Sequence, residues 1–190
     1  MIQLRTSRLC LLQLDLNWMQ RFAADSRQAG QQLEYYLKIP KSGRTEHPVT
    51  TYRYALSELG RIPPLEEHRR QWHLLWEIIA PGHRQRIGGI LFKGPPDERG
   101  QVEIGYGIDP AFRGKGYASE AMEAAIQWAF ANGAQTVIAK INPGNDASRR
   151  VLEKVGMRQY QTIGKMPCFR REKQRSFSVA DSSQTSYTEK

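Results

Sequence analysis

A glycine-containing hexapeptide, Arg113-Gly-Lys-Gly116-Tyr-Ala118, is the segment whose residue types most clearly suit a chemical task. Glycines at 114 and 116 have no Cβ atom, so successive backbone N–H groups can point at one anion. The hexapeptide opens a predicted helix, whose N-terminus adds the positive end of its dipole, and Arg113 and Lys115 add full charges. The sequence therefore predicts a phosphate-binding loop.

Two common nucleotide-binding loops do not fit this segment. A P-loop requires Ser or Thr directly after Gly-Lys, but Gly116 follows Lys115. A Rossmann loop requires a third glycine where Ser119 stands, a parallel βαβ unit, and an acidic residue at the end of the next strand, which here ends in Lys140-Ile-Asn142. The spacing therefore disfavours a nucleotide triphosphatase and a nicotinamide-dependent enzyme.

The elements around the loop form a predicted antiparallel meander followed by a β-α-β-α segment. Apolar runs joined by connections too short for parallel crossovers predict antiparallel strands, and an apolar stripe at helical spacing predicts a long helix directly after the loop. The sum is an α+β domain with a mixed, mostly antiparallel sheet. The predicted strands are 9–14, 74–80, 86–93, 101–108, 136–141, 158–163 and 176–179. One predicted helix follows residue 15, and others cover 35–37, 54–59, 66–71 and 117–132. A last predicted helix begins at Asn145 or Asp146 and ends at Gly156.

Length and composition indicate one domain, residues 1–175, with a Ser- and Thr-rich tail at 176–190. The chain has 190 residues, of which 39% are hydrophobic, enough to close a core. No apolar run reaches the roughly 18 residues that span a bilayer, and the first residues lack the pattern of a secretory signal, so we expect a cytoplasmic protein. Cys10 and Cys168 lie far apart and the histidines share no ligand spacing, which predicts no metal site.

The net charge of +9 raises the question of nucleic-acid binding. Basic residues occur singly through the first half and are not gathered into a stripe with interleaved aromatics. A denser group runs from Lys165 to Arg175. A solvated basic surface is the favoured interpretation, with nucleic acid disfavoured as the main partner.

Together with its flanks, the loop resembles the Arg/Gln-x-x-Gly-x-Gly/Ala pyrophosphate loop of the GNAT superfamily of N-acetyltransferases, which holds the diphosphate of acetyl-coenzyme A. The strand at 102–110 and the helical segment from Asn145 to Met157 are similar to the branch that includes ribosomal-protein N-terminal acetyltransferases. Thr6-Ser-Arg-Leu9 also resembles the start of that branch. The resemblance covers about residues 2–163.

The resemblance implies a single-domain fold with a splayed central strand pair flanked by helices. In this superfamily the strand before the loop carries a bulge, for which Gly105 and Gly107 are suited, and the pantetheine of coenzyme A inserts beside it. Backbone N–H groups there would bind the thioester carbonyl. The residues implied to bind acetyl-coenzyme A are Ile108, Arg113, Gly114, Lys115, Gly116, Tyr117, Ala118, Asn142 and Asn145.

The implied reaction is transfer of acetyl to a primary amine, on a protein N-terminus or a small molecule, by direct attack through a tetrahedral intermediate. The amine must first lose a proton to a base. Glu103, two residues before Gly105, matches a glutamate that often does this in the family and is the candidate base, with an outward-facing strand residue as its alternative role. Glu77, on the facing strand, is the second candidate.

The proton donor to the leaving thiolate departs from the family pattern. Many relatives use a tyrosine seven residues after the asparagine that matches Asn145, and here that position is Leu152. Ser148 is the implied substitute, and helix capping is its alternative role. Arg149 and Arg150 could reach phosphates or be solvated, and five aromatic residues could line the acceptor side or belong to the core: Tyr35, Tyr36, Tyr54, Trp72 and Trp76.

Three functions stay open from the sequence. The first is the acetyltransferase, whose acceptor would be a small amine or a peptide N-terminus, a ribosomal protein among the candidates, acting as a monomer or homodimer without a membrane. The second is a coenzyme A-binding module that does not catalyse. The third is a basic protein associated with RNA or the ribosome.

Overall fold

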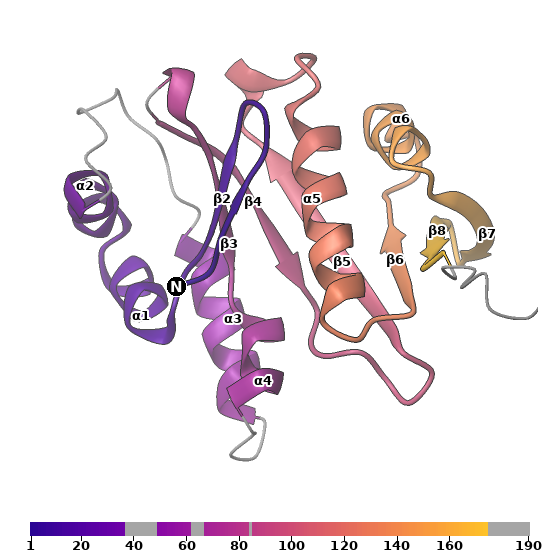
Figure 1. Ribbon diagram of the computed structural model, residues 1–190, viewed down its shortest axis with the longest axis horizontal. Coiled ribbons are helices and arrows are strands. Elements are labelled where there is room, and N and C mark those ends of the chain that lie inside the picture. The colour runs from indigo at the N-terminus through magenta and orange to yellow at the C-terminus, as the bar shows by residue number, and fades with distance from the viewer. Residues whose placement is uncertain (37–48, 62–66, 84, 175–190) are drawn as a thin grey trace, which may run out of the picture.

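The computed structural model describes residues 1–36, 49–61, 67–83 and 85–174 (Figure 1). In these ranges eight strands form one sheet in the order β1-β2-β3-β4-β5-β6-β8-β7. Only the β5–β6 pair is parallel, and the other pairs are antiparallel. The strands are β1 (Gln3–Arg5), β2 (Cys10–Gln13), β3 (Trp76–Ala80), β4 (Gln85–Phe92), β5 (Gln101–Ile108), β6 (Thr136–Lys140), β7 (Arg158–Ile163) and β8 (Met166–Glu172).

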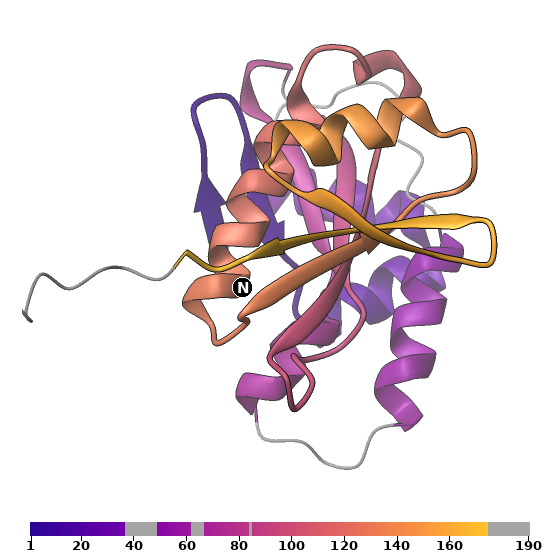
Figure 2. The ribbon, with the colours of Figure 1, turned by 90° about the vertical axis from the view of Figure 1, so that its right-hand side faces the viewer.

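The helices of the described part lie on the two faces of this sheet (Figure 2). In that view α5 lies to the left of the sheet and α3 to the right. The helices are α1 (Leu16–Ala24), α2 (Ser26–Tyr36), α3 (Val49–Arg61), α4 (Glu67–Arg70), α5 (Tyr117–Ala131) and α6 (Asp146–Lys154), with short 3₁₀ turns η1 (Gln71–His73), η2 (Pro81–His83) and η3 (Pro110–Phe112).

Two cores result, one on each face of the sheet. Because side chains alternate along a strand, Ile78, Ile90 and Ile104 turn to the face that α5 covers, where they join Met122 and Ile126 of that helix in one buried cluster. We call this the α5 face. The second cluster, on the α3 face, joins α1, α2 and α3 to β2 and β3.

The predicted fold class is confirmed, since the described chain is an α+β unit with a mixed, mostly antiparallel sheet between helices. The three-strand meander forms as β3, β4 and β5, and α5 and α6 begin where the loop and Asn145 predict. Asn145 caps α6 by accepting from the backbone N–H of Ser148, and Asp15 caps α1 in the same way. None of the described helices is both long and apolar enough to cross a membrane.

The sequence failed to predict β8 and misjudged the extent of α2. Cys168 and Phe169 are consecutive buried residues on opposite faces of β8, so the strand lacks the polar–apolar alternation that reveals a half-buried strand. The predicted strand at 176–179 and the tail lie outside the described residues. Helix α2 begins at Ser26, well before the predicted short helix at 35–37.

Candidate active site

Strands β5 and β6 part beyond their first three residue pairs. They pair only from Gln101↔Thr136 to Glu103↔Ile138, although β5 continues to Ile108. The Glu103 carbonyl accepts from the Lys93 N–H of the neighbouring chain segment. Since hydrogen-bonding direction alternates along an antiparallel strand, the backbone groups of Tyr106 and Ile108 point away from β4 and into the opening.

The expectation of a bulge at Gly105 and Gly107 is wrong, because β5 has no bulge there. From Phe92↔Ile104 to Gly88↔Ile108 the β4–β5 register advances without a shift, so β5 is regular there. The irregularity near this site lies instead between β3 and β4, where the register shifts at Ile78/Ile79. The opening arises because β6 diverges, and it needs no bulge in β5.

The predicted anion loop connects η3 to the first turn of α5. Gly114 and Gly116 have φ of 75° and 80°, a left-handed conformation that other residues rarely adopt. Gly116 is also the N-cap of α5, and with no side chain it leaves the first N–H groups of the helix to an outside acceptor. Tyr117 and Ala118, two of the residues predicted to bind the cofactor, therefore present backbone donors at the helix start.

The turn between β1 and β2, which contains Thr6, Ser7 and Arg8, holds this loop in place. The Arg8 guanidinium donates to the Lys115 carbonyl at 3.0 Å and forms an ion pair with Glu120 at 2.7 Å. The hydroxyls of Thr6 and Ser7 donate to the same Glu120 carboxylate at 2.6 and 3.1 Å. Burial by itself raises the pKa of Glu120, but hydrogen bonds from Thr6 and Arg8 outweigh it and hold that pKa below its usual value.

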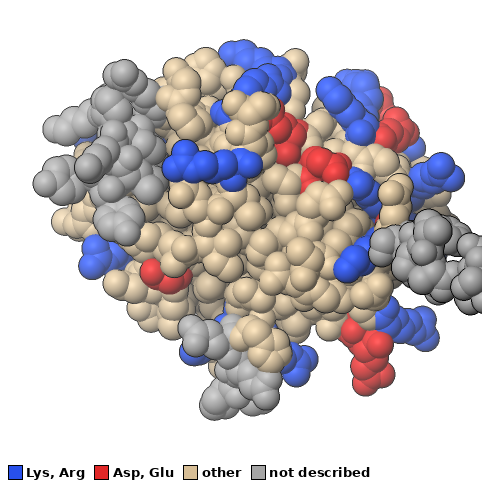
Figure 3. Space-filling view, in the orientation of Figure 1, with Lys and Arg blue, Asp and Glu red and all other residues tan. Residues whose placement is uncertain are grey.

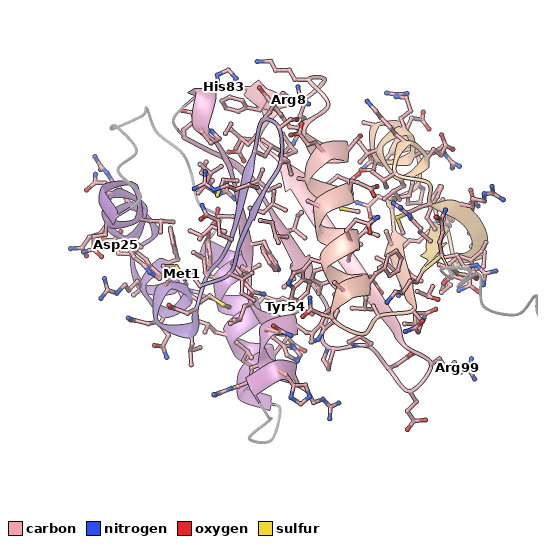
Figure 4. The ribbon with its side chains drawn as sticks, viewed as in Figure 1. Met1, Arg8, Asp25, Tyr54, His83 and Arg99 are labelled. Carbon is pink, nitrogen blue, oxygen red and sulfur yellow. The ribbon has the colours of Figure 1, made fainter. Side chains whose placement is uncertain are left out.

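His83 and Arg8 approach the start of α5 from two separate elements (Figure 4). His83 Nε2 lies 2.9 Å from the Tyr117 hydroxyl, and the Arg8 guanidinium lies 4.8 Å from the centre of the Tyr117 ring. Arg113 donates to the Ile108 carbonyl at 2.9 Å, which ties the loop to the end of β5. Sequence reasoning did not assign Arg8 and His83 to the site, although Arg8 lies in the Thr6–Leu9 segment that the resemblance includes.

On the α3 face a cavity of about 410 Å³ begins beside the opening. Its floor is a row of direct cross-strand partners, Glu77↔Gly89 and Gly89↔Gly107. Gly107 leaves open space over β5, with no atom within 4 Å of where a Cβ would stand, whereas the Arg86 guanidinium lies over Gly89, 3.6 Å from that position. The Glu77 carboxylate and Arg86 therefore border the cavity together. The cavity wall also includes Arg113, so one hollow reaches from Glu77 to the start of the loop.

The Glu77 side chain is 3% exposed and takes part in a buried polar network. The Tyr52 hydroxyl donates to one carboxylate oxygen and Arg86 Nε to the other. Arg86 also donates to both oxygens of Asp109 at 3.1 Å. Burial, reinforced by the nearby Glu77 carboxylate, raises the pKa of Tyr52, which keeps the phenol protonated as a donor. The network holds the Glu77 carboxylate in one orientation.

Glu103, the first candidate base, does not line this cavity. Its carboxylate is shared between Lys93 and Lys140, with the Lys140 contact at 2.7 Å. Burial raises the pKa of Glu103, but hydrogen bonds from these two lysines outweigh burial and hold the pKa below its usual value. Since Glu77 is also held by a cation, Arg86, what separates the two carboxylates is that Glu77 lines the cavity and Glu103 does not.

The predicted residues near α6 lie at the other side of the opening. Asn145 caps α6 by accepting from the Ser148 N–H at 3.0 Å, so Asn145 and not Ser148 has the capping role, and Asn142 is exposed just after β6. The Tyr106 hydroxyl of β5 reaches across to the Ser148 carbonyl at 3.4 Å, and burial raises the pKa of Tyr106. Tyr106, which the sequence reasoning did not single out, thus bridges the opening close to Ser148.

The candidate acceptor-side aromatics separate into core and surface. Trp72 and Trp76 are buried and both pack on Trp128, with Trp76 also bordering the cavity. Tyr54 is 53% exposed and lies far from the start of α5 in Figure 4. The side chains of Tyr35 and Tyr36 lie outside the described part.

Two further observations concern the arginines of α6, Arg149 and Arg150, and metal binding. Arg149 is held by Gln159 at 2.9 Å, and Arg150 is exposed. No group of three or more His, Cys, Asp or Glu side chains within residues 1–36, 49–61, 67–83 and 85–174 is arranged to hold a metal ion.

Comparisons with known proteins agree with this geometry. Residues 8–158 match the sequence model of the Acetyltransferase (GNAT) domain. An uncharacterised N-acetyltransferase of Bacillus subtilis, YjdG, is 28% identical over 157 residues, which cover 82% of this chain and 89% of that protein.

Solved structures with a similar fold include a ribosomal-protein acetyltransferase and a complex with a coenzyme A disulfide. The ribosomal-protein-S5-alanine acetyltransferase of Vibrio fischeri has a TM-score of 0.58 at 15% identity, covering 90% of this chain and 96% of its own. Mycobacterium smegmatis RimJ, solved in complex with CoA-disulfide, has a TM-score of 0.58 at 20% identity, covering 86% of this chain and 81% of its own. At these identities the likeness shows a shared fold.

Proposed function

The chain belongs to the GNAT acetyltransferase family and is an acetyl-coenzyme A-dependent acetyltransferase, and on that premise we propose that it acetylates the primary amine of a peptide N-terminus or a small molecule. The observation that carries the proposal is one cavity lined by the buried Glu77 carboxylate, by the part of β5 that borders the β5–β6 opening, and by Arg113 at the start of the anion loop. Each of these parts suits one portion of a bimolecular acetyl transfer.

The loop residues fit the diphosphate of coenzyme A. Two left-handed glycines, the uncapped start of α5 and the charges of Arg113 and Lys115 form a donor set for a phosphate. The backbone groups of Tyr106 and Ile108 suit the extended pantetheine arm and its thioester carbonyl. Acetyl-coenzyme A supplies the activated acetyl group, and Asn142 and Asn145 stay candidates for binding the arm.

We place the amine beside Glu77. A protonated amine entering the cavity meets this carboxylate, which is held in position by Tyr52 and Arg86. Glu77 takes the proton, directly or through one water, and the neutral amine attacks the thioester at β5 to give a tetrahedral intermediate. Glu103 is the alternative base, and Tyr106 or Ser148 is placed to return a proton to the leaving thiolate.

The cofactor is tested by thermal denaturation with coenzyme A, NAD and ATP. At about 100 times its dissociation constant a ligand stabilises by about 2.7 kcal/mol, which for a chain of this size raises Tm by about 5–10 °C. We expect this shift with coenzyme A alone. A larger shift with NAD or ATP contradicts the loop assignment.

The reaction is tested by incubating the protein with labelled acetyl-coenzyme A and a panel of amines and peptides, with Glu77→Gln in parallel. We expect coenzyme A release that depends on the acceptor and is lost in the variant. Coenzyme A binding without release, whatever the acceptor, identifies a binding module instead of an enzyme.

A further inference from the structure

Four cations lie on the α3 face of the sheet, one just after β4 and three on the strands beyond β5. Direct cross-strand partners share a face, and the row Glu103↔Ile138, Ile138↔Arg170 and Arg170↔Arg158 crosses four strands. Lys93 and Lys140 lie on this face as well, since both contact Glu103. We call Lys93, Lys140, Arg170 and Arg158 the basic strip.

No described helix covers the half of the α3 face that lies beyond β5. The core cluster under α1, α2 and α3 draws its strand residues from β2 and β3 and contains none from β5 to β8. Arg158 is exposed and the Arg170 side chain is 50% exposed. In Figure 2 the turn of the β7–β8 hairpin, in yellow, extends to the same side of the sheet as α3. The basic strip therefore faces solvent.

The strip has more positive charge than its own carboxylates balance. Arg158 and Arg170 are direct cross-strand partners, an arrangement in which like charges repel. The Arg170 contact to Glu172, at 3.5 Å, involves a carboxylate that is 64% exposed, and Lys93 and Lys140 share the single carboxylate of Glu103. Within the described ranges no ion pair holds Arg158. An acidic group from another molecule would relieve this repulsion.

The strip is continuous with the proposed acceptor cavity. Both lie on the α3 face, and Glu103 is two residues, about 7 Å, from the cavity residue Gly105 along β5. Arg170 and Arg158 lie two and three strands further, at about 4.8 Å a strand. Glu77 itself lies two strands from Gly107, which is four residues from Glu103, so Glu77 is about 17 Å from Glu103. A polypeptide whose N-terminal amine lies at Glu77 would therefore reach Lys93 and Lys140 with about its fifth or sixth residue and Arg170 and Arg158 with about its eighth or ninth, at about 3.4 Å a residue.

We propose that the acceptor is a polypeptide with acidic residues shortly after its N-terminus, and that the basic strip binds those residues while Glu77 faces its terminal amine. This inference rests on the proposed function and names its substrate class. A nucleic acid fits less well, because Glu103 and Glu172 interrupt the strip and a phosphate backbone offers the cavity no aliphatic amine.

The test uses two peptides with the same first two residues, one continuing with Glu and Asp and the other with Ser and Gly. In low salt we expect kcat/KM to be about tenfold higher for the acidic peptide than for the neutral one, because its KM is lower. This preference should shrink as salt is added. In the double variant Arg158→Glu/Arg170→Glu the preference disappears, while transfer to a short neutral peptide is unchanged. The control Arg27→Glu/Arg99→Glu makes the same change in net charge at exposed residues outside the strip and keeps the preference.

Equal rates for both peptides, or a preference that survives in the strip variant, overturn the inference. Fluorescence anisotropy of the labelled acidic peptide compares its binding to the wild type and to the strip variant without any catalysis. If no peptide is acetylated, the binding measurement still tests the strip, and the missing transfer counts against the proposed function instead. Tight binding of a single-stranded RNA that needs Arg158 and Arg170, together with no preference between the peptides, assigns the strip to RNA and also overturns the inference.

Discussion

Replacing Gly107 by valine is expected to block the acceptor without unfolding the protein. Gly107 lies outside the left-handed region, and a Cβ atom there meets no atom within 4 Å, because its partner Gly89 has no side chain either. Valine also suits a strand better than glycine does. The two added methyl groups extend into the cavity of about 410 Å³ beside Glu77.

A methylene-sized misfit in a pocket costs about 1–3 kcal/mol, so we expect kcat/KM for the acceptor to fall about 10- to 200-fold. The coenzyme A dissociation constant and Tm should change little. The assay is steady-state acetyl transfer to an acceptor that the wild type uses, with calorimetric coenzyme A binding and thermal denaturation beside it.

Gly88→Ala is the matched contrast, because its Cβ would lie 2.2 Å from the Gly107 carbonyl oxygen. That clash is expected to cost about 1–3 kcal/mol, or about 3–10 °C of Tm. Unchanged acceptor kinetics in Gly107→Val refute the placement of the amine, and a loss of Tm as large as that of Gly88→Ala refutes the open space beside Gly107.

Three further predictions follow from the site. Glu77→Gln should lower kcat/KM about 10²- to 10⁴-fold at neutral pH and Glu103→Gln less than about tenfold, and the opposite order in steady-state assays would make Glu103 the base. Arg8→Ala removes the hydrogen bond to the Lys115 carbonyl and should weaken coenzyme A binding about tenfold by calorimetry, whereas an unaltered affinity would show that the turn does not position the loop. Because the folded-state pKa of Glu120 is lowered, its ion pair stabilises above the unfolded-state pKa of about 4.3 and is lost as pH falls through the folded-state pKa. Urea denaturation should therefore show Glu120→Gln less stable by about 1 kcal/mol at pH 7 with a gap that closes below about pH 4, and a gap independent of pH would contradict this.

The anion loop and the elements beside it could be predicted because their signals are local. Gly114, Gly116 and the first turn of α5 are neighbours in the sequence, and the same residues form the loop in space. The meander could be predicted for the same reason, since short connections force neighbouring strands to pair antiparallel.

The position of the carboxylate in the cavity could not be predicted in this way. Glu77, Gly89 and Gly107 come from three strands and meet only through their pairing register. Glu103 matches a family pattern along one strand, but sequence spacing does not reveal that Lys93 and Lys140 enclose it. Strand β8 was missed because its buried residues, Cys168 and Phe169, face two different layers.

Where the charges gather on the surface could also not be predicted without the pairing register of the strands. On the α5 face, Lys and Arg occur singly or in small groups around the rim, and uncharged residues cover the centre (Figure 3). This agrees with the scattered pattern in the sequence. The basic strip becomes visible only once Arg158, Arg170 and Lys140 are placed on one face by β6, β8 and β7.

Amide chemical-shift mapping by ¹⁵N NMR tests the assignment of the loop most directly. Titration with coenzyme A should move the backbone amides of residues 113–118 most, and titration with pantetheine, which lacks the diphosphate, should leave those amides in place while moving the amides of Tyr106 and Ile108. Shifts confined to other regions, or no shift at millimolar coenzyme A, would contradict a diphosphate site at the start of α5.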